Sequence, residues 1–329
     1  MSHSNISIFV PHLGCENQCT FCNQRHITGV SISPSADEVD KCVQIALASK
    51  NFDSSKGEIA FFGGSFTAIE RSYMEELLSA AYKYVKDGSV SGIRISTRPD
   101  CISAEILEFL KKYGVSAIEL GAQSMSDFVL KQNKRGHNAG DVEFASKIIK
   151  DFGFELGLQM MTGLYQSSAD DDLYTANKIV ELKPDTVRIY PTITLKNTEL
   201  EILFNKGLYC PPTLNESVEL CSVLLELFSK NDIKVIRLGL HSIDETAYVA
   251  GPWHPSFREL CDSYIFKKKL EKIITKEGSY KVFVSGRNVS KAIGQNRSNI
   301  EYFRQNGILI KIITDNTIDN NDFKVEEVK

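Results

Sequence analysis

The sequence lacks any apolar run long enough to span a bilayer, and its first ten residues have neither the basic nor the apolar segment of a signal peptide. We therefore expect a cytoplasmic protein that does not enter membranes. Thiols stay reduced in that compartment, so a disulfide framework is not expected. Low-complexity segments and fixed-period repeats are absent too, which argues against a solenoid.

No charge of one sign dominates, because 38 Lys and Arg stand against 42 Asp and Glu in 329 residues. With 42% hydrophobic residues, this composition excludes a disordered chain and is typical of a globular protein. The length suits one large domain and a smaller one. We expect the boundaries 1–260, 261–316 and 317–329, the last being an acidic flexible tail.

Cysteine is sparse, yet three of the eight stand in "CENQCTFC", residues 15–22. Cys15, Cys19 and Cys22 have the spacing C-x3-C-x2-C. In a reducing compartment such a triplet favours a metal site over a disulfide. The other five stand singly and are expected to be small buried hydrophobic residues: Cys42, Cys101, Cys210, Cys221 and Cys261.

The residues alone leave three interpretations of the triplet open. A structural zinc site needs four ligands, so His12 or His26 would complete it. A thioredoxin-like redox pair uses Cys19 and Cys22 and leaves Cys15 without a role. Three thiolates also suit three irons of a [4Fe–4S] cluster whose fourth iron stays open for a substrate or cofactor.

Short β-type apolar runs alternate with segments of helical period along most of the chain. Strands are expected near 5–10, 58–64, 93–99, 117–124, 154–161, 186–194 and 233–240. Helices are expected between them, including one long helical stretch that ends at Phe152. This alternation predicts an α/β fold, a partial (β/α)6 barrel with a small α/β C-terminal subdomain. The cysteine loop, the Gly63–Gly64 pair, Gln123, Gln159 and Tyr190 all follow predicted strands, where such folds gather their chemistry.

The cysteine spacing, with an aromatic residue before the last cysteine, resembles the radical S-adenosylmethionine (SAM) superfamily. Further motifs occur in order: "FFGGSF" (61–66), "STRPD" (96–100), "ELGAQS" (119–124), "KRGH" (134–137), "GLQMMTGLY" (157–165) and "RIYPT" (188–192). The series is most similar to the radical SAM domain of the Elongator catalytic subunit and, more distantly, to the oxygen-independent coproporphyrinogen oxidases. The resemblance covers roughly residues 6 to 260.

This resemblance implies a [4Fe–4S] cluster on Cys15, Cys19 and Cys22. It also implies that SAM chelates the open iron and is cleaved reductively to a 5′-deoxyadenosyl radical. An electron donor such as ferredoxin or flavodoxin is then required.

The resemblance also implies a set of SAM contacts: Phe21 beside the adenine, Gly63 and Gly64 beneath the methionyl group, and Gln123 and Arg135 on the ribose and carboxylate. Ser65 stands where many relatives carry an acid for the SAM amino group, so that contact is expected to be weaker or made by backbone. Ser96 and Gln159 also depart from the residues usual at their positions.

The C-terminal part is basic, with nine Lys or Arg against two Glu in residues 264–297. Within it, "AIGQNRSNI" resembles the helix–GxxG–helix turn of KH modules, which grip single-stranded nucleic acid. The implied contacts are Lys291, Gly294, Gln295, Asn296 and Arg297, with an arginine where the last glycine is usual. The alternative is a plain capping subdomain.

We expect a radical SAM enzyme that modifies RNA, with a tRNA base as the target. One alternative is a radical SAM enzyme acting on a small molecule such as a porphyrinogen. Another is a non-catalytic, metal-bearing RNA-binding protein. The acetyltransferase domain of the Elongator subunit has no counterpart in these 329 residues. Carboxymethylation of wobble uridine is therefore not expected to carry over intact.

Overall fold

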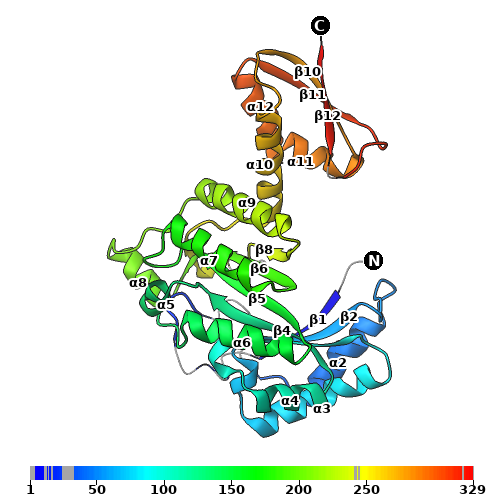
Figure 1. Ribbon diagram of the computed structural model, residues 1–329, viewed down its shortest axis with the longest axis vertical. Coiled ribbons are helices and arrows are strands. Elements are labelled where there is room, and N and C mark those ends of the chain that lie inside the picture. Colours follow the sequence, from blue (N-terminus) through cyan, green and yellow to red (C-terminus); the bar gives the residue numbers. More distant parts are fainter. Residues whose placement is uncertain are drawn as a thin grey trace. The chain divides into compact units, whose positions relative to one another are not determined.

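The computed structural model describes residues 4–10, 13, 15, 18–23, 33–240, 243, 245–320 and 322–328 (Figure 1). The chain forms two compact units. The first comprises Met1–Pro212 and Leu227–Pro252, and the second Thr213–Glu226 and Trp253–Lys329. In the described part of the chain, no helix is long and apolar enough to cross a membrane.

The first unit contains a seven-stranded sheet in the order β1-β2-β3-β4-β5-β6-β8, and all neighbouring strands are parallel. The strands are β1 (Ser4–Val10), β2 (Gly57–Gly63), β3 (Gly92–Thr97), β4 (Val115–Gln123), β5 (Glu155–Thr162), β6 (Thr186–Pro191) and β8 (Lys234–Leu238). The sheet curls into a half-barrel, which confirms the predicted partial barrel and includes a seventh strand. Because the strands are parallel, the segments that follow them meet at one edge of the sheet.

Helices join the strands (Figure 1). They are α2 (Ala36–Leu47), α3 (Arg71–Lys86), α4 (Ala104–Lys112), α5 (Asp127–Gln132), α6 (Ala139–Asp151), α7 (Ala169–Leu182) and α8 (Glu199–Asn205). The helix before β8 is α9 (Leu214–Lys230), which belongs to the second unit as far as Glu226. Side-chain caps begin several of them, including Ser35 at α2 and a capping box of Ser168 with Asp171 at α7. A short antiparallel pair, β7 (Thr194–Leu195) and β9 (Tyr248–Ala250), completes the unit.

The prediction of a single long helix ending at Phe152 is wrong, because residues 127–151 form two helices, α5 and α6, with a loop between them. Lys134 has a left-handed backbone (φ 54°) that breaks the helix after α5. Asn138 then caps α6, and the Asp141 carboxylate accepts a hydrogen bond from the Asn138 backbone amide. The motif "KRGH" therefore lies in a loop and not on a helix face.

The second unit has a three-stranded sheet in the order β11-β10-β12. Its elements are α10 (Phe257–Glu271), β10 (Gly278–Val284), α11 (Val289–Ile293), α12 (Ser298–Gln305), β11 (Ile308–Thr314) and β12 (Phe323–Val328). β11 runs parallel to β10, and β12 runs antiparallel to it. The prediction of a flexible tail at residues 317–329 is wrong for Phe323–Val328, which form a paired strand. The centre of the Phe323 ring lies 5.2 Å from that of Phe266.

Candidate active site

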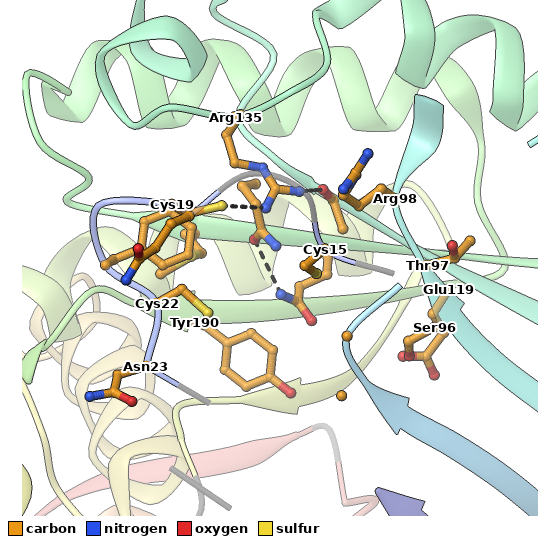
Figure 2. Close-up of a pocket in the computed structure, with 18 of the residues that line it drawn as sticks. Cys15, Cys19, Cys22, Asn23, Ser96, Thr97, Arg98, Glu119, Arg135 and Tyr190 are labelled. Carbon is orange, nitrogen blue, oxygen red and sulfur yellow. Dashed lines mark hydrogen bonds between the residues drawn. The ribbon is translucent and has the colours of Figure 1, made fainter. Parts of the chain in front are cut away.

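A cavity of about 920 Å³ lies where the parallel strands of the first unit end (Figure 2). All seven strands of the sheet, or the segments that follow them, contribute residues to its lining. The predicted site residues among them are Cys15, Cys19, Phe21, Cys22, Gly63, Gly64, Ser96, Gln123, Arg135, Gln159 and Tyr190. The structure thus brings together residues that are up to 175 positions apart (15 to 190).

The two glycines dock the cysteine loop onto the end of β2. The Gly64 amide donates to the Val10 carbonyl at 2.9 Å, and the Ser65 amide donates to the Leu13 carbonyl at 3.0 Å. A Cβ atom on Gly63 would lie 2.5 Å from the Val10 oxygen, and one on Gly64 would lie 2.1 Å from the Leu13 oxygen. Glycine is therefore required here by the approach of the loop backbone, in addition to any approach by a cofactor.

Ser65 does not line the cavity. Its side chain is fully buried and lies 2.8 Å from the Thr97 hydroxyl, and it accepts a hydrogen bond from the Arg98 amide at 3.2 Å. The hydroxyl thus ties the end of β2 to the end of β3. The Ser65 hydroxyl is therefore used within the sheet, and its backbone amide is used by Leu13.

Arg135 joins the cysteine loop to β4 (Figure 2). Its guanidinium donates to the Cys19 sulfur at 3.1 Å and to the Gly121 carbonyl at 2.8 Å. The Nε atom is buried and has no hydrogen-bond partner among the described residues. A buried donor of this kind favours an anionic partner in the cavity, such as a thiolate or a carboxylate.

His137 connects the loop between α5 and α6, which carries Arg135, to β4. Its Nε2 atom donates to the Ala122 carbonyl at 3.0 Å. Burial, together with the nearby Arg135 charge, lowers the pKa of His137 to about 4. The imidazole is therefore neutral at neutral pH and holds the loop by a hydrogen bond without adding charge.

Gln123 and Gln159 form an amide pair in the cavity, with Gln159 donating to the Gln123 side chain at 3.2 Å. Gln123 has a left-handed backbone (φ 65°), and the pairing of β4 with β5 is irregular at this point. The irregularity changes the direction of the Gln123 side chain from the one it would have in a regular strand. The hydrogen bond between the two side chains uses the Gln159 nitrogen and the Gln123 oxygen, and not the Gln123 nitrogen or the Gln159 oxygen.

Sequence reasoning missed a buried ionic network across five strands. Arg94 contacts Glu58 at 2.8 Å, Glu119 at 3.4 Å and Glu155 at 2.8 Å. Arg188 contacts the same Glu119 at 2.6 Å. The detectable signal was a charged residue inside each of several apolar strands, since such a residue must find a partner when buried. Glu119 lines the cavity, so its carboxylate places a negatively charged group in the cavity wall.

Arg98 was also missed as a cavity residue. Its guanidinium holds Asp100 through two hydrogen bonds of 3.0 and 2.6 Å, which fixes its position at the cavity wall. Burial raises the pKa of Cys15, while Arg98 and Arg135 act in the opposite direction. A negatively charged group at the cysteines would therefore face two cations.

In the described part of the chain, no three His, Cys, Asp or Glu side chains already stand in a metal-binding arrangement. The three cysteines nevertheless line one cavity, and two guanidinium groups lie where thiolate charge would develop. This donor set fits a thiolate-held cluster. His12 and His26, which the zinc alternative requires, lie outside the described residues. Of the single cysteines, Cys221 and Cys261 are buried as expected, whereas Cys210 is exposed.

The turn between α11 and α12 contains four of the five predicted nucleic-acid residues, and the fifth, Lys291, lies on α11. Gly294 has a φ of 76°, and a Cβ there would lie 2.9 Å from the Asn299 amide nitrogen. Arg297 has a left-handed backbone (φ 63°), the conformation that the usual glycine of a GxxG turn adopts freely. Gln295 is half-buried, and Asn296 and Arg297 are exposed.

Lys291 differs from these residues, because its ammonium lies 3.5 Å from the carboxylate of Asp262. That carboxylate offsets part of the charge that Lys291 offers to a phosphate. Arg297 is therefore the stronger cation of the predicted interface.

Comparison with known proteins identifies the family. A family model described as the radical SAM superfamily matches residues 9–177, and one described as the radical SAM C-terminal domain matches residues 184–267. The chain is 27% identical over 237 residues to the tRNA uridine(34) acetyltransferase of Methanocaldococcus infernus, a match that covers 66% of this chain and 44% of that protein. An uncharacterized protein of Methanocaldococcus jannaschii is 27% identical over 251 residues, covering 75% of this chain and 74% of that protein.

Among solved structures, the archaeal Elp3 of Methanocaldococcus infernus with an N-terminal deletion has the same fold. The TM-score is 0.66 at 24% identity, over 82% of this chain and 64% of that chain. This chain spans about half the length of the acetyltransferases that it matches. The family model matches more than half of the chain, and the cavity presents the cysteine triplet at the expected place. The chain therefore belongs to the radical SAM superfamily, whose enzymes use a [4Fe–4S] cluster and SAM.

Proposed function

We propose that this radical SAM enzyme modifies RNA and that its target is a tRNA base. The observation that carries the proposal is the pairing of two features in one chain. One is a cysteine-lined cavity of about 920 Å³. The other is the turn Gly294–Arg297, in which Asn296 and Arg297 are exposed and have a left-handed backbone, within the basic stretch 264–297. Relatives named tRNA uridine(34) acetyltransferases support the same substrate class.

In the proposed site, Cys15, Cys19 and Cys22 hold the cluster. Cluster and SAM, when bound, together supply a 5′-deoxyadenosyl radical. The protein's own contribution is to position SAM and to exclude water. Gly63 and Gly64 keep the loop close to β2, and Arg135 offers its guanidinium to negative charge beside Cys19.

The remaining contacts concern the nucleoside part of SAM. Phe21 lies at the cavity and offers an apolar ring to the adenine, and the Gln123–Gln159 pair offers amide groups to the ribose. Ser96 lies at the same wall without a charge to offer. The proposal also includes a cytoplasmic location and an electron donor such as ferredoxin or flavodoxin, because reductive cleavage of SAM consumes one electron.

Replacing Arg135 by alanine is expected to weaken SAM binding by about 10- to 100-fold. A hydrogen bond to a charged group contributes on the order of 1.5–3 kcal/mol, and Arg135 offers such a bond from a partly buried position. Isothermal titration with SAM on iron-loaded protein measures the change. Arg135→Lys is the matched control that keeps the charge but loses the planar fork, and we expect it to recover part of the affinity. Unchanged SAM affinity in Arg135→Ala would remove this residue from the proposed site.

The RNA part of the proposal is tested by replacing Lys291 and Arg297 together by glutamate. Each phosphate contact adds roughly −0.7 to the slope of log affinity against log salt for single strands. The double variant is therefore expected to bind total tRNA more weakly and with a shallower slope. Filter binding at low and at physiological salt measures both quantities.

The matched control for that test is Lys41→Glu with Lys112→Glu, two exposed lysines of the first unit that carry the same charge change. SAM cleavage without substrate should stay at the parent rate in both double variants, because the cavity is untouched. Salt-independent binding, or equal affinity in parent and turn variant, would favour the small-molecule alternative. Anaerobically prepared protein that binds tRNA but contains no iron would favour the non-catalytic alternative.

A further inference from the structure

The three-stranded sheet of the second unit has helices on only one face, as far as the described residues show (Figure 1). On that face, Tyr280, Val282 and Val284 of β10 pack in a core with side chains of α10, α11 and α12. Successive side chains of a strand point to opposite faces, so the alternate residues of β10 lie on the uncovered side.

The strand register defines this open face. Lys281 pairs with Lys311 on β11 and with Glu326 on β12, and Phe283 pairs with Ile313 and with Lys324. Ser279 pairs with Leu309 and Val328 at the other end. The open face is therefore formed by Ser279, Lys281, Phe283, Leu309, Lys311, Ile313, Lys324, Glu326 and Val328.

The open face is both apolar and basic. Leu309 is 59% exposed and Val328 is 44% exposed, which is high for apolar side chains on one sheet. Lys281, Lys311 and Lys324 are exposed. The Lys324 ammonium lies 2.7 Å from the carboxylate of Glu326, which offsets its charge, so Lys281 and Lys311 carry the positive charge that the face offers to a ligand. Phe283 lies in the middle, half-buried, with the Lys324 ammonium 5.8 Å from its ring centre.

This combination fits a nucleic acid better than a protein partner. Lysine is depleted from the centres of protein–protein interfaces, whereas here three lysines surround the aromatic residue. Ammonium groups contact phosphates, and a partly exposed aromatic ring on a sheet can stack with an unpaired base. A duplex would not present a base to the ring, so the face suits a single-stranded segment.

We propose that the open face is a second RNA-binding surface, on which an unpaired base stacks on Phe283 while Lys281 and Lys311 contact the flanking phosphates. The inference rests on the proposed function, because it assumes that the substrate is RNA. It goes beyond the turn Gly294–Arg297 by assigning base stacking to a different part of the same unit. The turn then contacts backbone, and the sheet holds a base.

The test uses the full chain and a short fluorescein-labelled single-stranded RNA of mixed sequence, with binding followed by fluorescence anisotropy. Phe283→Leu keeps an apolar side chain but removes the ring, and we expect affinity to fall at least about fivefold, since stacking contributes about 1–3 kcal/mol per base. Phe283→Trp is the conservative variant and should bind as tightly as the parent or more tightly.

Lys281→Gln with Lys311→Gln should lower affinity and make the salt slope shallower by roughly 0.7 for each lost contact. Lys41→Gln with Lys112→Gln is the charge-matched control and should bind like the parent. Thermal unfolding of each variant shows whether the fold is kept. If Phe283→Leu fails to fold, the two exposed lysines decide the question.

The outcomes separate the two proposals. One outcome would overturn the proposal that the open face binds RNA and leave the proposed function standing. In it, Phe283→Leu and the Lys281→Gln/Lys311→Gln variant bind RNA like the parent, while the Lys291→Glu/Arg297→Glu variant loses affinity for RNA. If the parent binds no RNA at any salt concentration, both the proposal of an RNA substrate and the proposal for the open face are overturned. Light scattering that shows a dimer dissociated by Phe283→Leu, with RNA binding unchanged, would make the face a contact between two copies and overturn the proposal.

Discussion

Replacing Cys15, Cys19 or Cys22 by alanine, one at a time, is expected to abolish SAM cleavage. The cluster needs three thiolates from the protein, and each of the three lines the cavity. Loss of one ligand leaves an iron without its thiolate, and no other cysteine lines that cavity among the described residues. Anaerobically reconstituted parent should carry about four irons, and each variant should lose most of them.

The measurements are iron content, absorbance of the brown protein, and 5′-deoxyadenosine formed after reduction. Cys42→Ala is the matched control, because Cys42 lies half-buried on α2 and does not line the cavity. It should keep both iron and SAM cleavage at the parent level. Stoichiometric zinc in place of iron in the parent, or full SAM cleavage by any of the three variants, would contradict the assignment.

Replacing Gly64 by alanine is expected to lower iron content nearly as far as loss of a cysteine, although no ligand is removed. The new Cβ atom would lie 2.1 Å from the Leu13 carbonyl oxygen, so the cysteine loop has to move away from β2. Overpacking of this kind costs about 1–3 kcal/mol, and here relief comes most easily from the loop. The hydrogen bond from the Ser65 amide to Leu13 of the loop would be lost with that movement.

Gly286→Ala is the matched control for this substitution. A Cβ atom at Gly286 would lie 3.5 Å from its nearest neighbour, an ordinary contact, and its backbone does not require glycine. Iron content and SAM cleavage should then equal those of the parent. Full iron content in Gly64→Ala would show that the glycine pair does not set the position of the cysteine loop.

Much of the active-site cavity could be predicted from the sequence because its residues follow strands. The spacing of Cys15, Cys19 and Cys22 is local, and parallel strands bring the ends of β2, β4 and β5 to one edge. The family resemblance then supplied Gln123, Arg135 and Gln159, all of which line the cavity. Their roles in holding SAM stay predictions.

The remaining features depend on contacts between distant residues, which local patterns do not encode. The ionic network joins Arg94 to three glutamates on three other strands, and no residue near Arg94 in the sequence indicates which glutamates these are. Ser65 was assigned to SAM by its place in the motif, but its hydroxyl is used by Thr97. The acidic composition of the last residues hid the alternation of Phe323 and Val325, which pack against the core of the second unit.

The ionic network also has a consequence for how this sheet tolerates change over evolution. Arg94 contacts three carboxylates, and Arg188 contacts one of them, Glu119. Loss of Arg94 would leave one guanidinium group for three negative charges, and breaking a buried ion pair in this way costs about 3–5 kcal/mol. Loss of one glutamate would still leave Arg94 with two carboxylate partners. We therefore expect related chains to vary at single glutamate positions more readily than at Arg94, and to replace Arg94 only together with its glutamates.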